Sequence, residues 1–418
     1  MNLSKFGQKF TSQAGIIQLM DDLGAVLSAG NNVRMLGGGN PSQIPQVQEY
    51  FRRRMQDILD QDNQFERFLS LYGPPQGDIA FIEALATLLQ QEYGWPIGPE
   101  NIVLTQGSQI AFFFLFNMFA GTYPDGSHKK ILLPLAPEYI GYTDVGIVDD
   151  IFIASKPEFE YLDHHTFKYH VDFNAITFTD EIGAICVSRP TNPTGNVLTD
   201  EEVVKLAALA QTHDIPFIID NAYGTPFPNI IFTEVQPLWN EQIILCMSLS
   251  KLGLPGVRTG IIIAHEKIAR GLADINAISS LAPGGFGATL VLDLVRSGDI
   301  ISLSQEVIKP YYEQKAAQAV ARLRKELQGT NFYIHKPEGA FFLWLWFKDL
   351  PITSQQLYER LKRRGVVVVP GEYFFPGITE PWSHKYECLR VSYAQAESVL
   401  NEAFQIIAQE VKQVYAGA

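Results

Sequence analysis

The stretch Ser248–Gly260, SLSKLGLPGVRTG, follows an apolar run and combines two hydroxyls, an amine, a guanidinium and several glycines. Glycine lets the backbone approach a ligand closely, while Ser248, Ser250 and Arg258 can donate hydrogen bonds to a phosphate. A lysine beside an arginine at a strand end has surroundings that lower its pKa, so Lys251 could attack an aldehyde. A surface lysine in an ordinary loop would explain the same residues equally well.

Short β-branched runs alternate with longer helix-compatible segments around this stretch. The runs are Asn101–Leu104, Ile131–Leu133, Ala184–Val187, Pro216–Ile219, Ile243–Cys246 and Gly260–Ile263. The clearest helix is Asp200–Leu209, with Thr199 as a candidate N-cap and Glu202 three residues later. Such alternation predicts an α/β layer with a mostly parallel sheet.

The pattern changes after about Gly287 and predicts a smaller α+β domain. Its expected helices are Gln305–Leu327, Ser354–Arg364 and Gln395–Val414, and its expected strands are Ala340–Phe347, Val366–Val369 and Leu389–Val391. We therefore predict a large domain over residues 45–290, a small domain over 291–418, and a segment 1–44 that packs with the small domain.

Composition excludes several classes of protein. The formal net charge is −13 in 418 residues, which argues against nucleic acid or an anionic membrane as a partner. No run approaches the ~20 apolar residues of a membrane helix. The three cysteines are widely spaced, which predicts neither disulfides nor a zinc site, and we expect a cytoplasmic protein.

Two further strand ends carry polar side chains. Asp220 falls at the end of a buried apolar run, where a carboxylate needs a cationic partner such as a protonated pyridine nitrogen. Tyr223 could donate to the oxygen of such a ring, and Asn192, in a rigid Pro-rich turn, could present its amide there. A turn-capping role for Asp220 and a plain turn around Asn192 are the simpler alternatives.

Two other features complete the pattern. Gly107, Ser108 and Gln109 begin an aromatic-rich helix, whose backbone N–H groups can bind an anion. Arg390 lies within a short apolar strand and needs a carboxylate from the protein or from a substrate. Together these features predict a site for pyridoxal 5′-phosphate (PLP) and an amino acid. They comprise a phosphate-binding loop, a carboxylate for a pyridinium, an amine for an aldehyde and an arginine for a carboxylate.

These motifs resemble the fold type I, class I and II aminotransferases. The order is Gly-Ser-Gln, N-P-T-G, D-x-x-Y, S-x-S-K-x-x-x-x-G-x-R and R-x-S, and it covers essentially the whole chain. Met35–Pro45, Leu135–Tyr142, Val187–Asn196 and Cys246–Gly256 resemble most the branch that acts on valine and pyruvate. The resemblance implies a seven-stranded sheet, PLP as cofactor, a homodimer with shared active sites and a ping-pong exchange of the amino group.

The resemblance also implies a role for each matching residue. Lys251 would hold PLP as a Schiff base and move the proton, and Asp220 would pair with the ring nitrogen. Tyr139 would stack on the ring, and Tyr72 would reach the phosphate of the neighbouring subunit. The remaining roles are phosphate binding by Gly107, Ser108, Gln109, Ser248, Ser250 and Arg258, ring-oxygen contacts by Tyr223 and Asn192, and carboxylate binding by Arg390 near Gly39 and Asn192.

One departure from the aspartate-specific branch bears on the substrate. That branch takes a second arginine from the stretch that matches Ile275–Leu292, which here contains no arginine or lysine. An acidic side chain would be left unpaired, so we expect a neutral amino acid of the valine or alanine type and a 2-oxo acid such as pyruvate.

Other functions on the same fold stay open. The cofactor motifs do not decide which bond of Cα breaks, so a lyase, decarboxylase or racemase remains an alternative. A ligand sensor fused to a DNA-binding domain ranks low, because the acidic charge opposes DNA binding and the stretch before Met35 is short. An α/β protein with a degenerate site would require Lys251 not to react.

Overall fold

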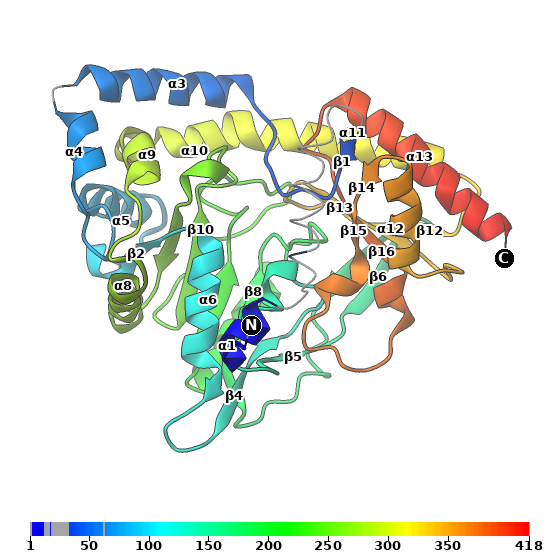
Figure 1. The fold of residues 1–418 in the computed structure, drawn as a ribbon, viewed down its shortest axis with the longest axis horizontal. Coiled ribbons are helices and arrows are strands. Elements are labelled where there is room, and N and C mark those ends of the chain that lie inside the picture. Colours follow the sequence, from blue (N-terminus) through cyan, green and yellow to red (C-terminus); the bar gives the residue numbers. More distant parts are fainter. Residues whose placement is uncertain (1, 12–16, 18–32, 62, 418) are drawn as a thin grey trace.

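The computed structural model describes residues 2–11, 17, 33–61 and 63–417. Within them, two large β-sheets lie side by side, each covered by helices (Figure 1), and a third sheet has only two short strands. The larger sheet has the order β2-β11-β10-β9-β8-β4-β3, with β5 also paired to β4. Its strands are β2 (Ile102–Thr105), β3 (Gly121–Thr122), β4 (His128–Leu133), β5 (Phe152–Ala154), β8 (Ile182–Ser188), β9 (Phe217–Asp220), β10 (Ile243–Ser248) and β11 (Gly260–Ile263).

This larger sheet confirms the predicted mostly parallel α/β layer. Strands β10, β9, β8, β4 and β5 pair in parallel, whereas β11 runs antiparallel to both β10 and β2. The sheet has eight strands, one more than expected, because the two-residue strand β3 pairs antiparallel with β4. So short a strand leaves no periodic signal in the sequence.

Helices cover both faces of the larger sheet because its strands are apolar on both sides. One face packs against α6 (Ser108–Phe119) and α8 (Glu266–Ser280). The other packs against α5 (Ile79–Tyr93), α7 (Asp200–Thr212) and α9 (Phe286–Ser297). The predicted cap of α7 is confirmed, because Thr199 and Glu202 form a reciprocal capping box.

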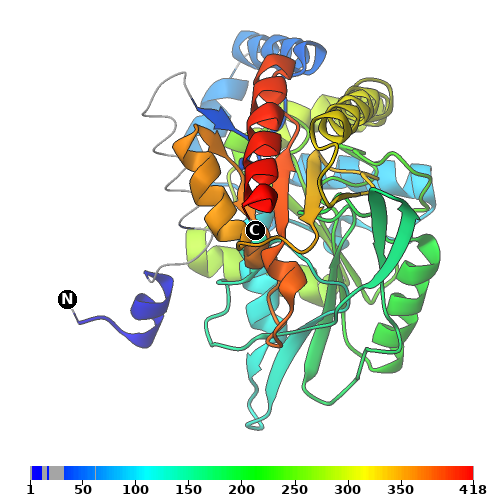
Figure 2. The ribbon, with the colours of Figure 1, turned by 90° about the vertical axis from the view of Figure 1, so that its right-hand side faces the viewer.

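The smaller sheet has the order β15-β16-β13-β12-β7-β6. Its strands are β6 (Glu158–Asp163), β7 (Thr166–His170), β12 (Phe332–His335), β13 (Phe342–Phe347), β15 (Val369–Pro370) and β16 (Cys388–Ser392). Around it lie α11 (Lys309–Glu326), α12 (Ser354–Arg363) and α13 (Glu397–Ala416), while α10 (Asp299–Leu303) and the π-helix η4 (Ser304–Ile308) join α9 to α11. Figure 2 shows α13 (red) running down the side of the molecule that faces the viewer, next to α12.

Chain segments cross between the two predicted domains, whose boundaries remain a prediction. The hairpin β6–β7 lies within residues 45–290, yet β7 pairs in parallel with β12. In the segment 1–44, β1 (Arg34–Met35) pairs with β14 (Val366–Val367). In the same segment, α1 (Lys5–Phe10) is tied to the 45–290 part, where Lys9 Nζ bonds Asp149 at 2.6 Å.

The remaining helices precede the larger sheet. They are α3 (Pro45–Asp60), with proline in its first turn, and α4 (Gln64–Ser70). Proline fits the first turn because no intrahelical partner awaits its missing N–H. The buried side of α3 includes Val47, Phe51 and Ile58, while α4 leads into an exposed loop at Leu71 and Tyr72.

Candidate functional site

Strands of the larger sheet bring the predicted residues to one of its edges. Asp220 ends β9, Asn192 lies in the loop after β8, and Lys251 follows β10. Because these strands are parallel, their carboxyl ends meet at the same edge, which is where ligands bind in open α/β sheets. The antiparallel strand β11 begins there, with Gly260 opposite Thr105 of β2.

Lys251 presents its amine at the centre of this edge. Its Nζ donates a hydrogen bond to the carbonyl oxygen of Gly39 at 2.7 Å. The same atom lies 5.4 Å from the ring centroids of both Tyr223 and Phe341. Burial, with Arg390 and then Arg258 nearby, lowers the pKa of Lys251 to about 8, although Asp220 acts in the opposite direction. At pH 7 roughly a tenth of the amine is therefore uncharged and nucleophilic, far more than for an ordinary lysine.

Asp220 holds its carboxylate among neutral donors. The hydroxyl of Tyr142 donates to Oδ2 at 2.7 Å, and the backbone N–H of Ala222 donates to Oδ1 at 3.1 Å. Burial raises the pKa of Asp220, while these hydrogen bonds and Lys251 oppose the rise. Among the described residues no basic side chain forms an ion pair with it. The site can therefore accept a cationic group on a ligand.

The predicted phosphate residues meet at the start of α6. Gly107 has φ +87°, and a Cβ atom there would lie 2.2 Å from Nη2 of Arg258, so only glycine fits. Arg258 Nη1 lies 3.4 Å from Ser250 Oγ, and Ser250 N donates to Ser248 Oγ at 3.1 Å. Ser108 is the first residue of α6, whose N-terminal N–H groups favour an anion.

Gln109 bridges this region to the loop after β4. Its Nε2 donates to the carbonyl oxygen of Gly141 at 2.8 Å, while its buried Oε1 has no hydrogen-bond partner among the described residues. A buried acceptor without a partner costs free energy unless a ligand or water supplies a donor. Gln109 is thus suited to contact a bound molecule.

Arg390 is 2% exposed and comes from β16 of the smaller sheet. Its Nη1 donates to Asn192 Oδ1 at 2.8 Å, and its Nη2 donates to the carbonyl oxygen of Gly37. The guanidinium also lies 4.3 Å from the ring centroid of Phe342. Its Nε is buried without a partner, and no carboxylate within the described ranges pairs with it. A buried guanidinium held only by neutral groups can still accept a carboxylate from a ligand.

The three predicted tyrosines differ in their placement. Tyr223 is buried beside Lys251. Tyr139 lies in the loop after β4, edge-on to Tyr142 with ring centroids 5.4 Å apart. Tyr72 stands apart, because it is 85% exposed in the loop after α4, and the single chain does not bring it to the other residues.

Sequence reasoning missed Tyr142, Phe341 and Gly37, which contact Asp220, Lys251 and Arg390 respectively. Tyr142 could have been found, because its hydroxyl follows a strand end in the same stretch as Tyr139. Gly37 contributes a carbonyl oxygen and Phe341 only a ring, so neither carries a chemical signature in the sequence.

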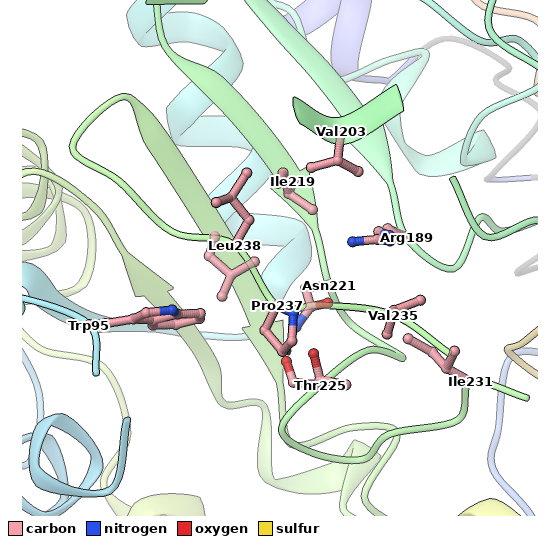
Figure 3. A pocket seen from close by; sticks show the side chains of 11 residues that line it. Trp95, Arg189, Val203, Ile219, Asn221, Thr225, Ile231, Val235, Pro237 and Leu238 are labelled. Atoms are coloured by element: carbon pink, nitrogen blue, oxygen red, sulfur yellow. Dashed lines mark hydrogen bonds between the residues drawn. The ribbon is translucent and has the colours of Figure 1, made fainter. Parts of the chain in front are cut away.

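A small pocket nearby is separate from this site (Figure 3). Ile219 and Leu245 line it from the larger sheet, and none of the predicted site residues does. Successive side chains of a strand point to opposite faces, so Ile219 faces this pocket while Asp220 points away from it. Arg189 also lines the pocket, where its Nη2 pairs with Asp200 at 2.5 Å.

Comparison with known proteins shows the family of the chain. Residues 36–407 match the family described as aminotransferase class I and II. The chain belongs to the class I and II aminotransferases. It is 52% identical to the valine–pyruvate aminotransferase of Escherichia coli K12 over 416 residues, which are 100% of this chain and 99% of the relative.

Solved structures of aminotransferases agree with this family. The valine–pyruvate aminotransferase of Salmonella typhimurium LT2 is 51% identical, with a TM-score of 0.89 over 97% of this chain and 100% of its own. An amino-acid aminotransferase structure from Psychrobacter arcticum 273-4 is 48% identical, with a TM-score of 0.97 over 100% of both chains. The fold type I class predicted from the sequence is therefore confirmed.

Class I and II aminotransferases use PLP, and the residues present fit it. The lysine with a lowered pKa matches its aldehyde, and the buried carboxylate without a cation matches its ring nitrogen. The glycine-lined anion site matches its phosphate. No cluster of metal-ligating side chains occurs in the part of the chain that the structure describes. Nor does any helix in that part have the length and apolar character to cross a membrane.

Proposed function

We propose that this aminotransferase moves an amino group between a neutral amino acid of the valine or alanine type and a 2-oxo acid such as pyruvate. The observation that carries the substrate class is Arg390, a buried guanidinium beside Lys251 without a protein carboxylate. Both an amino acid and a 2-oxo acid carry the planar carboxylate that it would bind.

Each site residue has a proposed part. Asp220 would pair with the pyridine nitrogen, while Tyr223 and Asn192 would bond the ring oxygen and Tyr139 would stack on the ring. The phosphate would be held by Gly107, Ser108, Gln109, Ser248, Ser250 and Arg258. These roles are supported by the placement of the residues along one edge of the larger sheet.

When bound, PLP supplies an aldehyde for the amino group and a ring that withdraws electrons from the substrate Cα. Arg390, Asn192 and Gly39 orient the substrate by its carboxylate end. Lys251 then takes the proton from Cα as a general base and returns a proton as a general acid. Its lowered pKa suits both proton transfers, because an amine with a pKa close to neutral pH can both take up and release a proton.

A stretch without basic residues supports a neutral side chain on the substrate. The stretch 275–292 spans the end of α8 and most of α9 and contains no basic residue. The E. coli relative at 52% identity is named for valine and pyruvate, which supports the same substrate class here. An acidic side chain would enter without a cation to pair with it.

A homodimer with shared active sites is also part of the proposal. Tyr72, Leu71, Ile278 and Leu281 are between 58% and 88% exposed in the single chain. Asn276, near Ile278 on α8, donates to the carbonyl oxygen of Pro75 at 2.9 Å, so the end of α8 adjoins the loop after α4. Exposed apolar side chains on adjoining segments mark an interaction surface.

The three cysteines are buried and unpaired, which supports a place for the protein in a reducing cytoplasm.

The test is a comparison of amino donors with pyruvate as acceptor. We expect kcat/KM for L-valine and L-alanine to exceed that for L-aspartate by at least about a hundredfold, the penalty of leaving one buried charge unpaired. Alanine requires a second 2-oxo acid as acceptor, because pyruvate is its own product. A preference for aspartate would overturn the neutral-substrate proposal, while leaving the family assignment intact.

A further inference from the structure

A line of polar side chains leads from Asp220 to a second buried carboxyl group. The hydroxyl of Tyr142 donates to Asp220 Oδ2 at 2.7 Å and lies 3.4 Å from Ser188 Oγ. Ser188 Oγ is in turn hydrogen-bonded to Glu138 Oε2, and Ser188 N donates to Glu138 Oε1 at 2.9 Å. Glu138 and Tyr142 come from the loop after β4, and Ser188 ends β8.

Glu138 lies where a negative charge would be costly. It is fully buried, and Tyr142 and Ser188 are at most 2% exposed. No basic side chain in the described ranges pairs with Glu138, and the nearby charge that acts on it is the like charge of Asp220. Burial raises the pKa of Glu138 to about 8, although hydrogen bonds from Ser188 oppose the rise. An unpaired buried carboxylate is strongly disfavoured, so the neutral acid is the stable form.

Counting hydrogens gives the chain a direction. Tyrosine and serine hydroxyls each carry a single hydrogen and can also accept one. Tyr142 gives its hydrogen to Asp220, so its oxygen is left to accept from Ser188. Ser188 then needs a donor on its other side. Ser188 Oγ lies within hydrogen-bond distance of Glu138 Oε2, and a protonated Glu138 would supply the hydrogen of that contact once the hydrogen of Ser188 is given to Tyr142, while Oε1 accepts from the backbone N–H of Ser188 at 2.9 Å.

We propose that Glu138 is a neutral acid at the far end of a one-way hydrogen-bond chain, through Ser188 and Tyr142, that keeps Asp220 an ionised acceptor. Glu138 acts through its neighbours and touches neither substrate nor cofactor, so it is a positioning residue. This inference rests on the proposed pairing of Asp220 with the ring nitrogen of PLP. An acceptor fixed on one side by Tyr142 keeps its remaining capacity for that nitrogen.

Infrared spectroscopy tests the protonation of Glu138 directly. The difference spectrum of the full-length enzyme with PLP, wild type minus Glu138→Gln, should contain the carbonyl band of a protonated carboxylic acid at pH 7. The cofactor-free protein should give the same band. A carboxylate band in its place would overturn the proposal. This readout does not depend on transamination, so it separates failure of the chain from failure of the proposed function.

Affinity for PLP tests the coupling to Asp220. Glu138→Gln keeps a donor and an acceptor in the same places, so its Kd for PLP, measured by tryptophan fluorescence, should stay within about twofold of wild type. Tyr142→Phe removes a hydrogen bond to a charged group and should weaken PLP binding about tenfold or more. Ser188→Ala, which breaks the chain one step further away, should weaken it about three- to tenfold.

Matched controls separate this coupling from packing. Ser304→Ala removes a buried hydroxyl that bonds only Ile300 within its own helical region, and Tyr415→Phe removes a hydroxyl remote from the site. Neither should change the Kd for PLP, and thermal unfolding of every variant should confirm that it is folded. Unchanged PLP affinity in folded Ser188→Ala, or a tenfold loss in Glu138→Gln, would overturn the proposal.

Discussion

Lys251, Asp220 and Arg390 are held by hydrogen bonds to neutral groups, and burial shifts the pKa of each toward its uncharged form. Such shifts are typical of groups that act on a ligand, because a purely structural charge is usually paired. The chemistry of these three residues was predictable from their motifs. The position of Tyr142 after a strand end was a signal in the sequence, but its partner was not, because the 2.7 Å contact joins the loop after β4 to the end of β9.

The lowered pKa of Lys251 predicts how PLP capture depends on pH. The uncharged amine reacts with the aldehyde, and its fraction rises as pH passes through about 8. The rate of PLP capture by the cofactor-free enzyme, trapped by borohydride and located by peptide mass spectrometry, should therefore rise up to about pH 8 and level off above it. A rate that keeps climbing to pH 10.5, the ordinary value for lysine, would show that Lys251 is not perturbed.

Arg390→Lys should damage substrate binding although it keeps the charge. Lysine cannot reproduce the planar pair of hydrogen bonds to a carboxylate and would lose those to Asn192 and Gly37. We expect kcat/KM for L-valine to fall about thirty- to several-hundredfold, or about 2–4 kcal/mol. Arg360→Lys is the matched control and should leave kcat/KM unchanged, because Arg360 pairs α12 with Glu410 of α13 and contacts none of the site residues. Equal values in the two variants would remove Arg390 from the substrate site.

Elements with a local signal were predicted, and those fixed by distant pairing were not. Helix α7 was expected from its capping box, and the predicted run Gly260–Ile263 coincides with β11. The hairpin β6–β7 was missed because β6 is mostly exposed and the hairpin joins the sheet only where β7 pairs with β12, more than 160 residues later in the chain. The predicted strand Val366–Val369 is instead divided, since Val366–Val367 pairs with β1 and Val369–Pro370 pairs with β16.

Glu202 makes the stability of α7 depend on pH. Although burial raises its pKa, hydrogen bonds from His170 and from the N–H groups of Val171 and Thr199 lower it to about 2, against an ordinary value of 4.5. A depressed folded-state pKa contributes stability that is complete above pH 4.5 and is lost as pH falls toward 2.

The unfolding midpoint of Glu202→Gln should thus lie below that of wild type at pH 7, and the gap should close in acid. Glu201→Gln, on the exposed side of the same turn, is the control and should show a much smaller gap. If the difference in unfolding midpoint between wild type and Glu202→Gln stays constant from pH 7 down to the lowest pH measured, the hydrogen bonds of Glu202 do not require an ionised carboxylate.

At the scale of the whole molecule, the site is assembled from both sheets and from the segment before α3. Lys251 bonds Gly39, 212 positions away, and Arg390 bonds Asn192, 198 positions away. Motif order could predict that these residues belong together, but only the fold gives their contacts. Tyr72 is the exception, because its proposed place is in the site of a second copy of the chain.

Mixing two inactive variants tests that shared site. If Tyr72 serves the neighbouring subunit, a hybrid dimer of Lys251→Ala and Tyr72→Ala concentrates both defects in one site and leaves the other intact. Random pairing of equal amounts makes half of the dimers hybrid, so about a quarter of all sites should be native. Activity near that level after mixing supports the shared site. Activity no greater than the mean of the two separate variants would place Tyr72 outside it.

The most direct measurement of the central claim follows nitrogen from ¹⁵N-labelled L-valine, with pyruvate and PLP, by NMR. The proposed function predicts ¹⁵N-alanine and the 2-oxo acid of valine in equal amounts, with formation slowed about 10⁴-fold in Lys251→Ala, which lacks the general base. Labelled ammonium, or a product that has lost CO₂, would instead assign lyase or decarboxylase chemistry to this site and contradict amino transfer.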